Sequence, residues 1–209
     1  MNENISFRNL KIVIKMKGMT IKSVTELCAE HASNISNICT GKRIPLTSLV
    51  AKICSILKVY PSEIVSFDDI EVNEELFPRS KREPLPFEFT GDVTYKPFWV
   101  FLAKYIEDWN KTHENKIDHN DIFNQIKSCR KEMVTEEQRL KFQEAAKKGV
   151  EARFGEGYVA KYKNHYDYSN GLSLSTRTKL RNDRPLNIAT IYEICKYFHC
   201  SIDYVMGYK

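Results

Sequence analysis

Long apolar runs are absent from this sequence of 209 residues. No stretch approaches the roughly 20 apolar residues that a membrane-spanning helix requires, and no secretory apolar segment follows Met1. The composition, 42% hydrophobic and 28% charged, is that of an ordinary folded domain rather than a disordered chain. These features predict a soluble protein with a cytoplasmic location and no membrane partner.

Patterns that mark metal sites or catalysis are also missing. The six cysteines form no CxxC pair, and the sequence contains no Gly-rich phosphate loop. Apart from the row of tyrosines described below, it contains no cluster of acid/base residues. Cys195, His199 and Cys200 lie close in sequence, but helix positions five residues apart point in different directions. We therefore expect reduced cysteines, no metal, no cofactor and no enzyme activity.

A row of tyrosines is the one pattern that raises an enzymatic alternative. Tyr158, Tyr162 and Tyr166 recur at helical spacing beside His165 and Asp167. Such a row can stack on single-stranded nucleic acid or supply a nucleophile. Half-buried helix packing explains the same spacing more simply, and we prefer it.

Charge divides the chain into three parts, although the net charge is only +5. Residues 1–66 carry nine Lys/Arg against four Asp/Glu, and residues 170–209 carry six against three. Between them, residues 67–93 hold eight Asp/Glu against three Lys/Arg and also contain three prolines. This composition predicts a linker over 67–93, whose prolines favour an extended path.

Apolar residues at helical spacing predict an all-α fold. Near the N-terminus they predict a helix over 6–17, a helix that begins close to Pro45, and a short one that Pro61 opens. In the C-terminal part they predict helices over 94–111, 122–133, 136–154 and 158–168.

The stretch Thr20–Gly41 predicts two short helices joined by a tight turn. Val24, Leu27 and Cys28 would face inward on the first helix, and Ile35 and Ile38 on the second. We expect Ser33 or Asn34 to cap the second helix. Its outward face would be short, polar and uncharged, which suits a close approach to base edges: Ser33, Asn34, Ser36 and Asn37.

The segment that follows resembles the lambda repressor/Cro-like (Xre-type) helix-turn-helix family. The matching motifs are Gly41-Lys42-Arg43-Ile44-Pro45, the apolar spacing of Leu49–Leu57, and Val59-Tyr60-Pro61-Ser62-Glu63-Ile64. The resemblance covers residues 6–66 and implies a five-helix DNA-binding domain over 1–66. The turn departs from the family, which places a glycine where Glu30–Ser33 stands, so a non-glycine residue would need a left-handed or altered conformation.

A weaker echo of the same family lies near the C-terminus. Ile194-Cys195 repeats Ile53-Cys54 at an offset of 194 − 53 = 141. Gly171–Asn182 resembles the family's turn and recognition helix, with Asp183 in place of the usual glycine. Arg177 occupies a position that is usually aliphatic, so its stem must snorkel or the helix must rotate.

These features predict a C-terminal helical domain over 94–209 that ends in a second, divergent helix-turn-helix unit over about 156–209. The segments 185–194 and 201–205 resemble the family's fourth and fifth helices. Two helices can serve as the first helix of this unit, 94–111 or 136–154, and the sequence leaves both open.

The resemblance implies a sequence-specific regulator of transcription, a repressor of bacterial, phage or mobile-element type, whose partner is double-stranded DNA. Two unlike units predict an asymmetric operator. Alternatively, only the N-terminal unit binds DNA, and the C-terminal domain binds a protein partner or a second copy of the chain. The candidate DNA-binding residues are Thr20, Lys22, Ser33, Asn34, Asn37, Lys42 and Arg43 in the first unit, and Ser175, Thr176, Lys179 and Arg181 in the second.

Overall fold

The computed structural model describes residues 4–73, 77, 91–126 and 171–208. This part of the chain is mostly helical, which confirms the predicted fold class at that level. The predicted helices over 136–154 and 158–168 lie outside the described residues, as do Tyr158, Tyr162, His165, Tyr166 and Asp167.

The N-terminal helices are α1 (Arg8–Met16), α2 (Ile21–Leu27), α3 (Ala32–Cys39), α4 (Thr47–Leu57) and α5 (Pro61–Ile64). The C-terminal helices are α6 (Lys96–Thr112), α7 (His119–Gln125), α11 (Leu174–Arg181), α12 (Ile188–Phe198) and α13 (Ile202–Val205).

Most of the inward faces follow the apolar spacing. Val24, Cys28, Ile35 and Ile38 are buried as predicted. Leu27 is an exception, because it is 63% exposed and the prediction that it faces inward is wrong. At 3.6 residues per turn, the buried side of α2 runs through Val24 and Cys28, and Leu27 lies beside it.

A short two-stranded sheet, which the sequence did not predict, joins the N-terminus to the start of the expected linker. Strand β1 (Ile5–Ser6) pairs antiparallel with β2 (Ser66–Phe67). Strands of two residues are too short to show the alternation on which sequence-based assignment depends. Phe67 therefore belongs to this sheet, although it was expected to begin the linker.

The described part of the expected linker packs against the C-terminal helices. The backbone N–H of Asn73 donates to the carbonyl of His199 at 2.7 Å. Phe77 is buried, with its ring centroid 4.8 Å from those of Phe101 and Tyr204. This segment thus connects the two halves by contact as well as by sequence.

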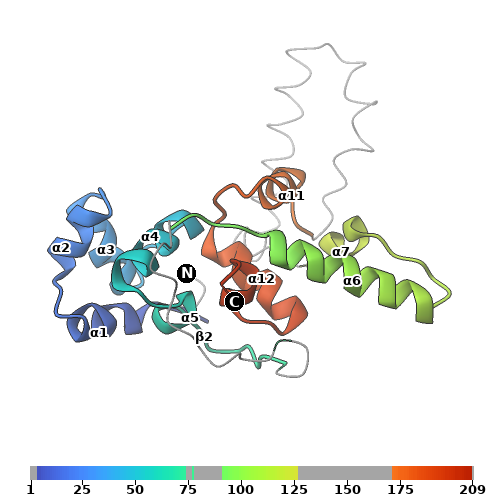
Figure 1. The fold of residues 1–209 in the computed structure, drawn as a ribbon, viewed down its shortest axis with the longest axis horizontal. Coiled ribbons are helices and arrows are strands. Elements are labelled where there is room, and N and C mark those ends of the chain that lie inside the picture. Colours follow the sequence, from blue (N-terminus) through green and yellow to red (C-terminus); the bar gives the residue numbers. More distant parts are fainter. Residues whose placement is uncertain (1–3, 74–76, 78–90, 127–170, 209) are drawn as a thin grey trace, which may run out of the picture.

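Helices α4 and α12 lie at the centre of the molecule (Figure 1). In this view α1, α2 and α3 lie on one side of this pair, α6 and α7 lie on the other, and α11 lies above α12. Thr47, at the start of α4, is fully buried between the halves. Its hydroxyl accepts from the backbone N–H of Leu186 at 3.0 Å and lies 2.9 Å from the hydroxyl of Tyr95.

Among the described residues, four that are not glycine adopt positive φ, a conformation that is energetically unfavourable for most side chains. Ala29 (φ 53°) directly precedes the turn Glu30–Ser33, so the left-handed residue lies one position earlier than expected. Asp183 (φ 51°) adopts the conformation that Gly41 (φ 72°) adopts after α3. Lys58 and His199 do the same at the ends of α4 and α12.

Glycine in place of His199 is expected to stabilise the protein. The left-handed conformation costs a residue with a side chain roughly 1–2 kcal/mol, which glycine avoids. Glycine itself loses more backbone entropy on folding, which offsets about 0.5–1 kcal/mol of this gain. We expect His199→Gly to raise the free energy of unfolding by about 0.5–1 kcal/mol in urea denaturation, because the backbone carbonyl that binds Asn73 is kept. His199→Ala retains the strain and should give no gain. An equal gain from both variants would contradict the backbone explanation.

Candidate nucleic-acid interface

The N-cap of helix α3 lies two residues before Ser33, the first of the two predicted caps. This N-cap is His31, whose Nδ1 lies 3.5 Å from the backbone nitrogen of Ser33 and 3.1 Å from the Ser33 hydroxyl. The prediction that Ser33 or Asn34 caps this helix is therefore wrong, because an imidazole nitrogen supplies the acceptor. Ser33 instead stands exposed in the first turn of α3.

Asn34 links both ends of α3 through its amide group. Its Nδ2 donates to Glu30 Oε2 at 2.6 Å, and its Oδ1 accepts a hydrogen bond from Arg43. This arrangement ties the residues before and after α3 to the helix. A bidentate contact to adenine uses the same two amide atoms, so base contact by Asn34 requires these partners to be exchanged.

The chain after α3 is held by the carbonyl of Asn37. It accepts from the backbone N–H groups of Lys42 and Arg43 at 2.8 Å and 3.2 Å. The structure thus brings three candidate residues together at the C-terminal end of α3. Lys42 and Arg43 are exposed there, whereas Asn37 is half-buried.

Helix α2 begins with a capping box. The Thr20 hydroxyl accepts from the backbone N–H of Ser23 at 3.1 Å, and the Ser23 hydroxyl accepts from that of Thr20 at 3.0 Å. Two free donors of the helix start are satisfied in this way. Lys22 is exposed within this first turn.

The candidate residues of α11 divide into free and engaged side chains. Ser175 and Lys179 are exposed, while the Thr176 hydroxyl lies 2.9 Å from that of Ser173, the N-cap. The guanidinium of Arg181 lies 5.8 Å from the Trp99 ring and 3.3 Å from His119 Nε2. Arg181 therefore packs over α6 and α7 while it remains exposed, and its contact with DNA stays a prediction.

Arg177 makes three hydrogen bonds, two of which join α11 to α7. Its Nε donates to the Leu172 carbonyl at 2.8 Å, and its two terminal nitrogens donate to the Asn120 and Asn124 side chains at 3.2 Å and 2.5 Å. The guanidinium also lies 5.7 Å from the Phe123 ring. Burial lowers the pKa of Arg177, and the nearby Asp118 opposes this effect. The only sequence signal for this contact is an arginine at a usually aliphatic position.

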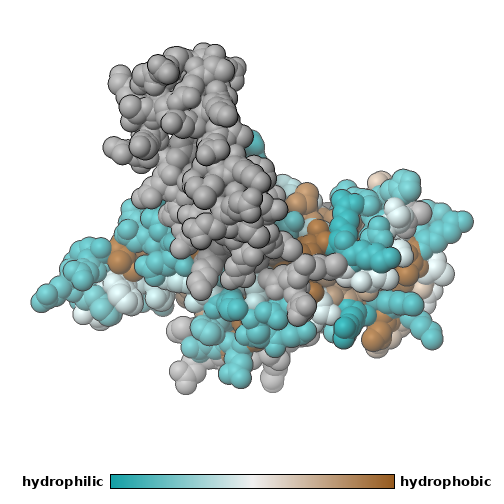
Figure 2. All heavy atoms as spheres, turned by 180° about the vertical axis from the view of Figure 1, so that it is seen from behind, coloured by the Kyte–Doolittle hydropathy of each residue, from teal (hydrophilic) through white to brown (hydrophobic). Residues whose placement is uncertain are grey.

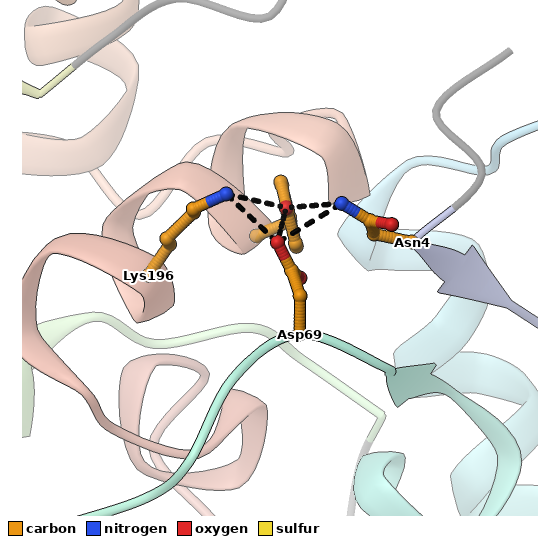
Figure 3. Close-up of polar contacts among 4 residues, drawn as sticks. Asn4, Asp69 and Lys196 are labelled. Carbon is orange, nitrogen blue, oxygen red and sulfur yellow. Dashed lines mark hydrogen bonds and ion pairs between the residues drawn. The ribbon is translucent and has the colours of Figure 1, made fainter.

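Asp69 is the centre of a polar cluster that sequence reasoning missed (Figure 3). Its Oδ2 accepts from Asn4 at 2.9 Å and from the Tyr192 hydroxyl and Lys196 Nζ at 2.7 Å each. Burial by itself would raise the pKa of Asp69, but the hydrogen bonds from Lys196 and Tyr192 outweigh it and lower the pKa. The cluster joins the N-terminus, the segment after β2, and α12.

Removal of the Asp69 carboxylate should destabilise the protein in a pH-dependent manner. Hydrogen bonds to a charged group contribute about 1.5–3 kcal/mol, so we expect Asp69→Ala to lower the free energy of unfolding by about 1.5 kcal/mol at pH 7. A carboxyl whose pKa is lowered on folding stabilises the protein above its unfolded pKa and loses this effect as the pH falls. The difference from wild type should therefore shrink below about pH 4. Asp68→Ala, at the exposed neighbour, is the control, and a pH-independent difference would rule out the ion pair.

The surface in the view of Figure 2 is mostly hydrophilic, with hydrophobic side chains in separate patches. Among the described residues, no group of three His, Cys, Asp or Glu side chains is placed to hold a metal ion. The five described cysteines are free thiols. Within the described ranges, no helix is both long enough and apolar enough to cross a bilayer.

Comparison with known proteins identifies the N-terminal part. Searches of curated proteins and of solved structures gave no significant match. A family model described as the Cro/C1-type HTH DNA-binding domain matches residues 9–69, the segment that forms α1 to α5 and β2. Residues 9–69 are therefore similar to the Cro/C1-type helix-turn-helix DNA-binding domain, which confirms the resemblance predicted for residues 6–66.

Proposed function

We propose that this protein is a sequence-specific regulator of transcription, a repressor of bacterial, phage or mobile-element type, whose partner is duplex DNA. The observation that carries the proposal is the helix pair α2–α3 within the Cro/C1-type domain. Helix α3 exposes short polar side chains and is followed at once by the exposed cations Lys42 and Arg43. This arrangement suits a helix that reads base edges while its end contacts phosphates.

The side chains of the first unit divide by role. Ser33 and Asn37 contact bases from α3, since their short polar groups allow the helix to approach the groove floor. Lys22, at the start of α2, and Lys42, after the end of α3, contact phosphates. Thr20, the N-cap of α2, holds the helix start from which Lys22 makes its contact. Asn34 and Arg43 hold α3 in place until DNA offers new partners.

A second helix-turn-helix unit, formed by α7 and α11, supports the first. Helix α6 packs against α7 and α13, as α1 packs against α2 and α5. We therefore assign α6, rather than 136–154, as the first helix of this unit. Residues 127–170 then stand between α7 and α11 in the sequence, and Ser175 and Lys179 are the side chains that face DNA.

An exposed leucine on α11 favours a second candidate function. Leu174 is 79% exposed in the first turn of this helix, and a protein partner could cover it. Leu174→Ala and Lys179→Ala separate the two functions. Loss of operator affinity in Lys179→Ala supports two DNA-reading units, whereas loss of a co-purifying protein in Leu174→Ala, with unchanged DNA affinity, supports the mixed function.

Alanine in place of Lys42 should weaken binding to all duplexes alike. One phosphate contact contributes about one unit to the slope of log K against log salt. We expect Lys42→Ala to reduce this slope by about one and to leave the preferred sequence unchanged. Fluorescence anisotropy titrations at several salt concentrations measure it. Lys104→Ala, on the exposed side of α6, is the control that should change neither property.

Selection of duplexes from a random pool by the full chain tests the proposed function. Enrichment of one shared sequence, together with repression of a reporter that carries it, supports the proposal. No enrichment at low salt would refute DNA binding. The full chain is required because α4 and α5 pack against residues of the C-terminal half, as Thr47 does against Leu186.

A further inference from the structure

The two halves of the chain meet through a reciprocal pair of backbone hydrogen bonds. The N–H of Thr47 donates to the carbonyl of Leu186 at 2.8 Å, and the N–H of Ile188 donates to the carbonyl of Pro45 at 3.1 Å. The two bonds flank an antiparallel bridge between Leu46 and Asn187. An antiparallel pair of this kind has a local twofold axis that passes between the paired residues.

This axis relates positions that are also equivalent in sequence. Leu46 and Asn187 occupy the same place before α4 and α12, at the offset of the Ile53–Ile194 echo. Helices α4 and α12 have 11 residues each, and α5 and α13 have 4 each. A chance contact between two helical domains would not pair equivalent residues.

A second contact between equivalent positions lies at α5 and α13. The backbone N–H of Ser62 donates to Asp203 Oδ1 at 2.8 Å, and its hydroxyl donates to Asp203 Oδ2 at 2.5 Å. These residues are 141 positions apart and occupy the same place in the two helices. Two points at which equivalent residues touch are enough to define the direction of an axis.

The helices farther from the axis repeat as well. Lys58 and His199 both adopt φ near 50° at the ends of α4 and α12. Gly41 and Asp183 both adopt positive φ directly after α3 and α11. The two halves therefore share local conformation outside the contact, and each contributes one helix, α4 or α12, to the central pair (Figure 1).

We propose that the chain is an internal pseudo-dimer, in which one molecule binds one duplex through two half-sites in inverted orientation. This inference rests on the proposed function and specifies its ligand. Twofold-related reading helices meet half-sites of opposite direction, as in operators whose symmetry mirrors that of a dimer. Here covalent linkage replaces association of two chains.

The half-sites differ in sequence because the reading faces differ. Ser33 corresponds to Ser175, but Asn34 corresponds to Thr176 and Asn37 to Lys179. Asparagine pairs with adenine, whereas lysine prefers guanine or phosphate. The operator is therefore an inverted repeat hidden by unlike half-sites.

Transfer of the base-contacting residues of α3 to α11 should make the two half-sites of the operator alike. The variant Leu174→Ala/Thr176→Asn/Lys179→Asn gives α11 the short polar side chains of α3 and leaves the Arg177 contacts in place. Selection from a random duplex pool with this full chain should return a near-perfect inverted repeat, whereas wild type returns two unlike blocks. Sedimentation of each complex should show one chain per duplex.

The outcomes separate this inference from the proposed function. A direct repeat, a single block, or two chains per duplex would overturn the pseudo-dimer while DNA recognition by α3 stands. No enrichment by wild type would overturn the proposed function itself. A grafted chain that does not fold, judged by its thermal unfolding, is replaced by Lys179→Asn alone, which should make the second block more like the inverted first block.

Discussion

Replacement of Thr47 by valine is expected to lower the free energy of unfolding by about 3 kcal/mol, since each buried polar group left without a partner costs about 1–3 kcal/mol. Valine matches the shape of threonine but has no hydroxyl. The Leu186 N–H and the Tyr95 hydroxyl both lose the Thr47 hydroxyl as a hydrogen-bond partner. Both groups lie inside the contact between the halves, where water cannot replace the bonds.

Thr47→Ser is the matched control, because it keeps the hydroxyl and removes one methyl group. It should cost about 1 kcal/mol, well below the valine variant. Urea denaturation of the full chain measures both. Equal costs for serine and valine would show that packing, not the hydroxyl, holds the halves together.

Replacement of Arg177 by methionine is expected to cost about 2–3 kcal/mol and to weaken the second half-site selectively. Methionine keeps a stem of similar length over Phe123 but removes the donors to the Leu172 carbonyl, Asn120 and Asn124. One hydrogen bond to a charged group contributes about 1.5–3 kcal/mol. Solvent can replace part of these bonds because Arg177 is only half-buried, so the total expected cost is that of about one such bond. Helix α11 then loses the two hydrogen bonds of Arg177 to α7 and keeps the Arg181–His119 contact.

Arg177→Lys distinguishes charge from geometry. Lysine restores the charge but not the fork of three donors, so it should recover less than half of the lost stability. Hydroxyl-radical footprinting on a selected duplex should show weaker protection of one block and unchanged protection of the block read by α3. Equal weakening of both blocks would contradict the assignment of α11 as a separate reading helix.

Local pattern predicted the helices because their buried faces depend on residues three and four positions apart. Ile35 and Ile38 on α3 are buried for that reason. The same rule failed at Leu27, where the inward stripe is narrow and α2 ends. It also misplaced the start of α3, since histidine is an uncommon N-cap and His31 gave no signal.

Contacts between distant positions were beyond the reach of the sequence. Asp69 was assigned to an acidic linker, yet its partners Tyr192 and Lys196 lie in α12. The weak echo of Ile53 in Ile194 predicted a repeat but not the proposed axis that relates its copies. That axis depends on backbone bonds of Thr47 and Leu186, which no side-chain pattern encodes.

The proposed function requires this chain to read base sequence in duplex DNA. The most direct test is the affinity of the full chain for its selected duplex and for a scrambled duplex of the same composition, at the same near-physiological salt concentration. We predict that the selected duplex binds at least about 10³-fold more tightly, as in specific protein–DNA complexes. Equal affinities would show that only phosphates are bound and would contradict the claim.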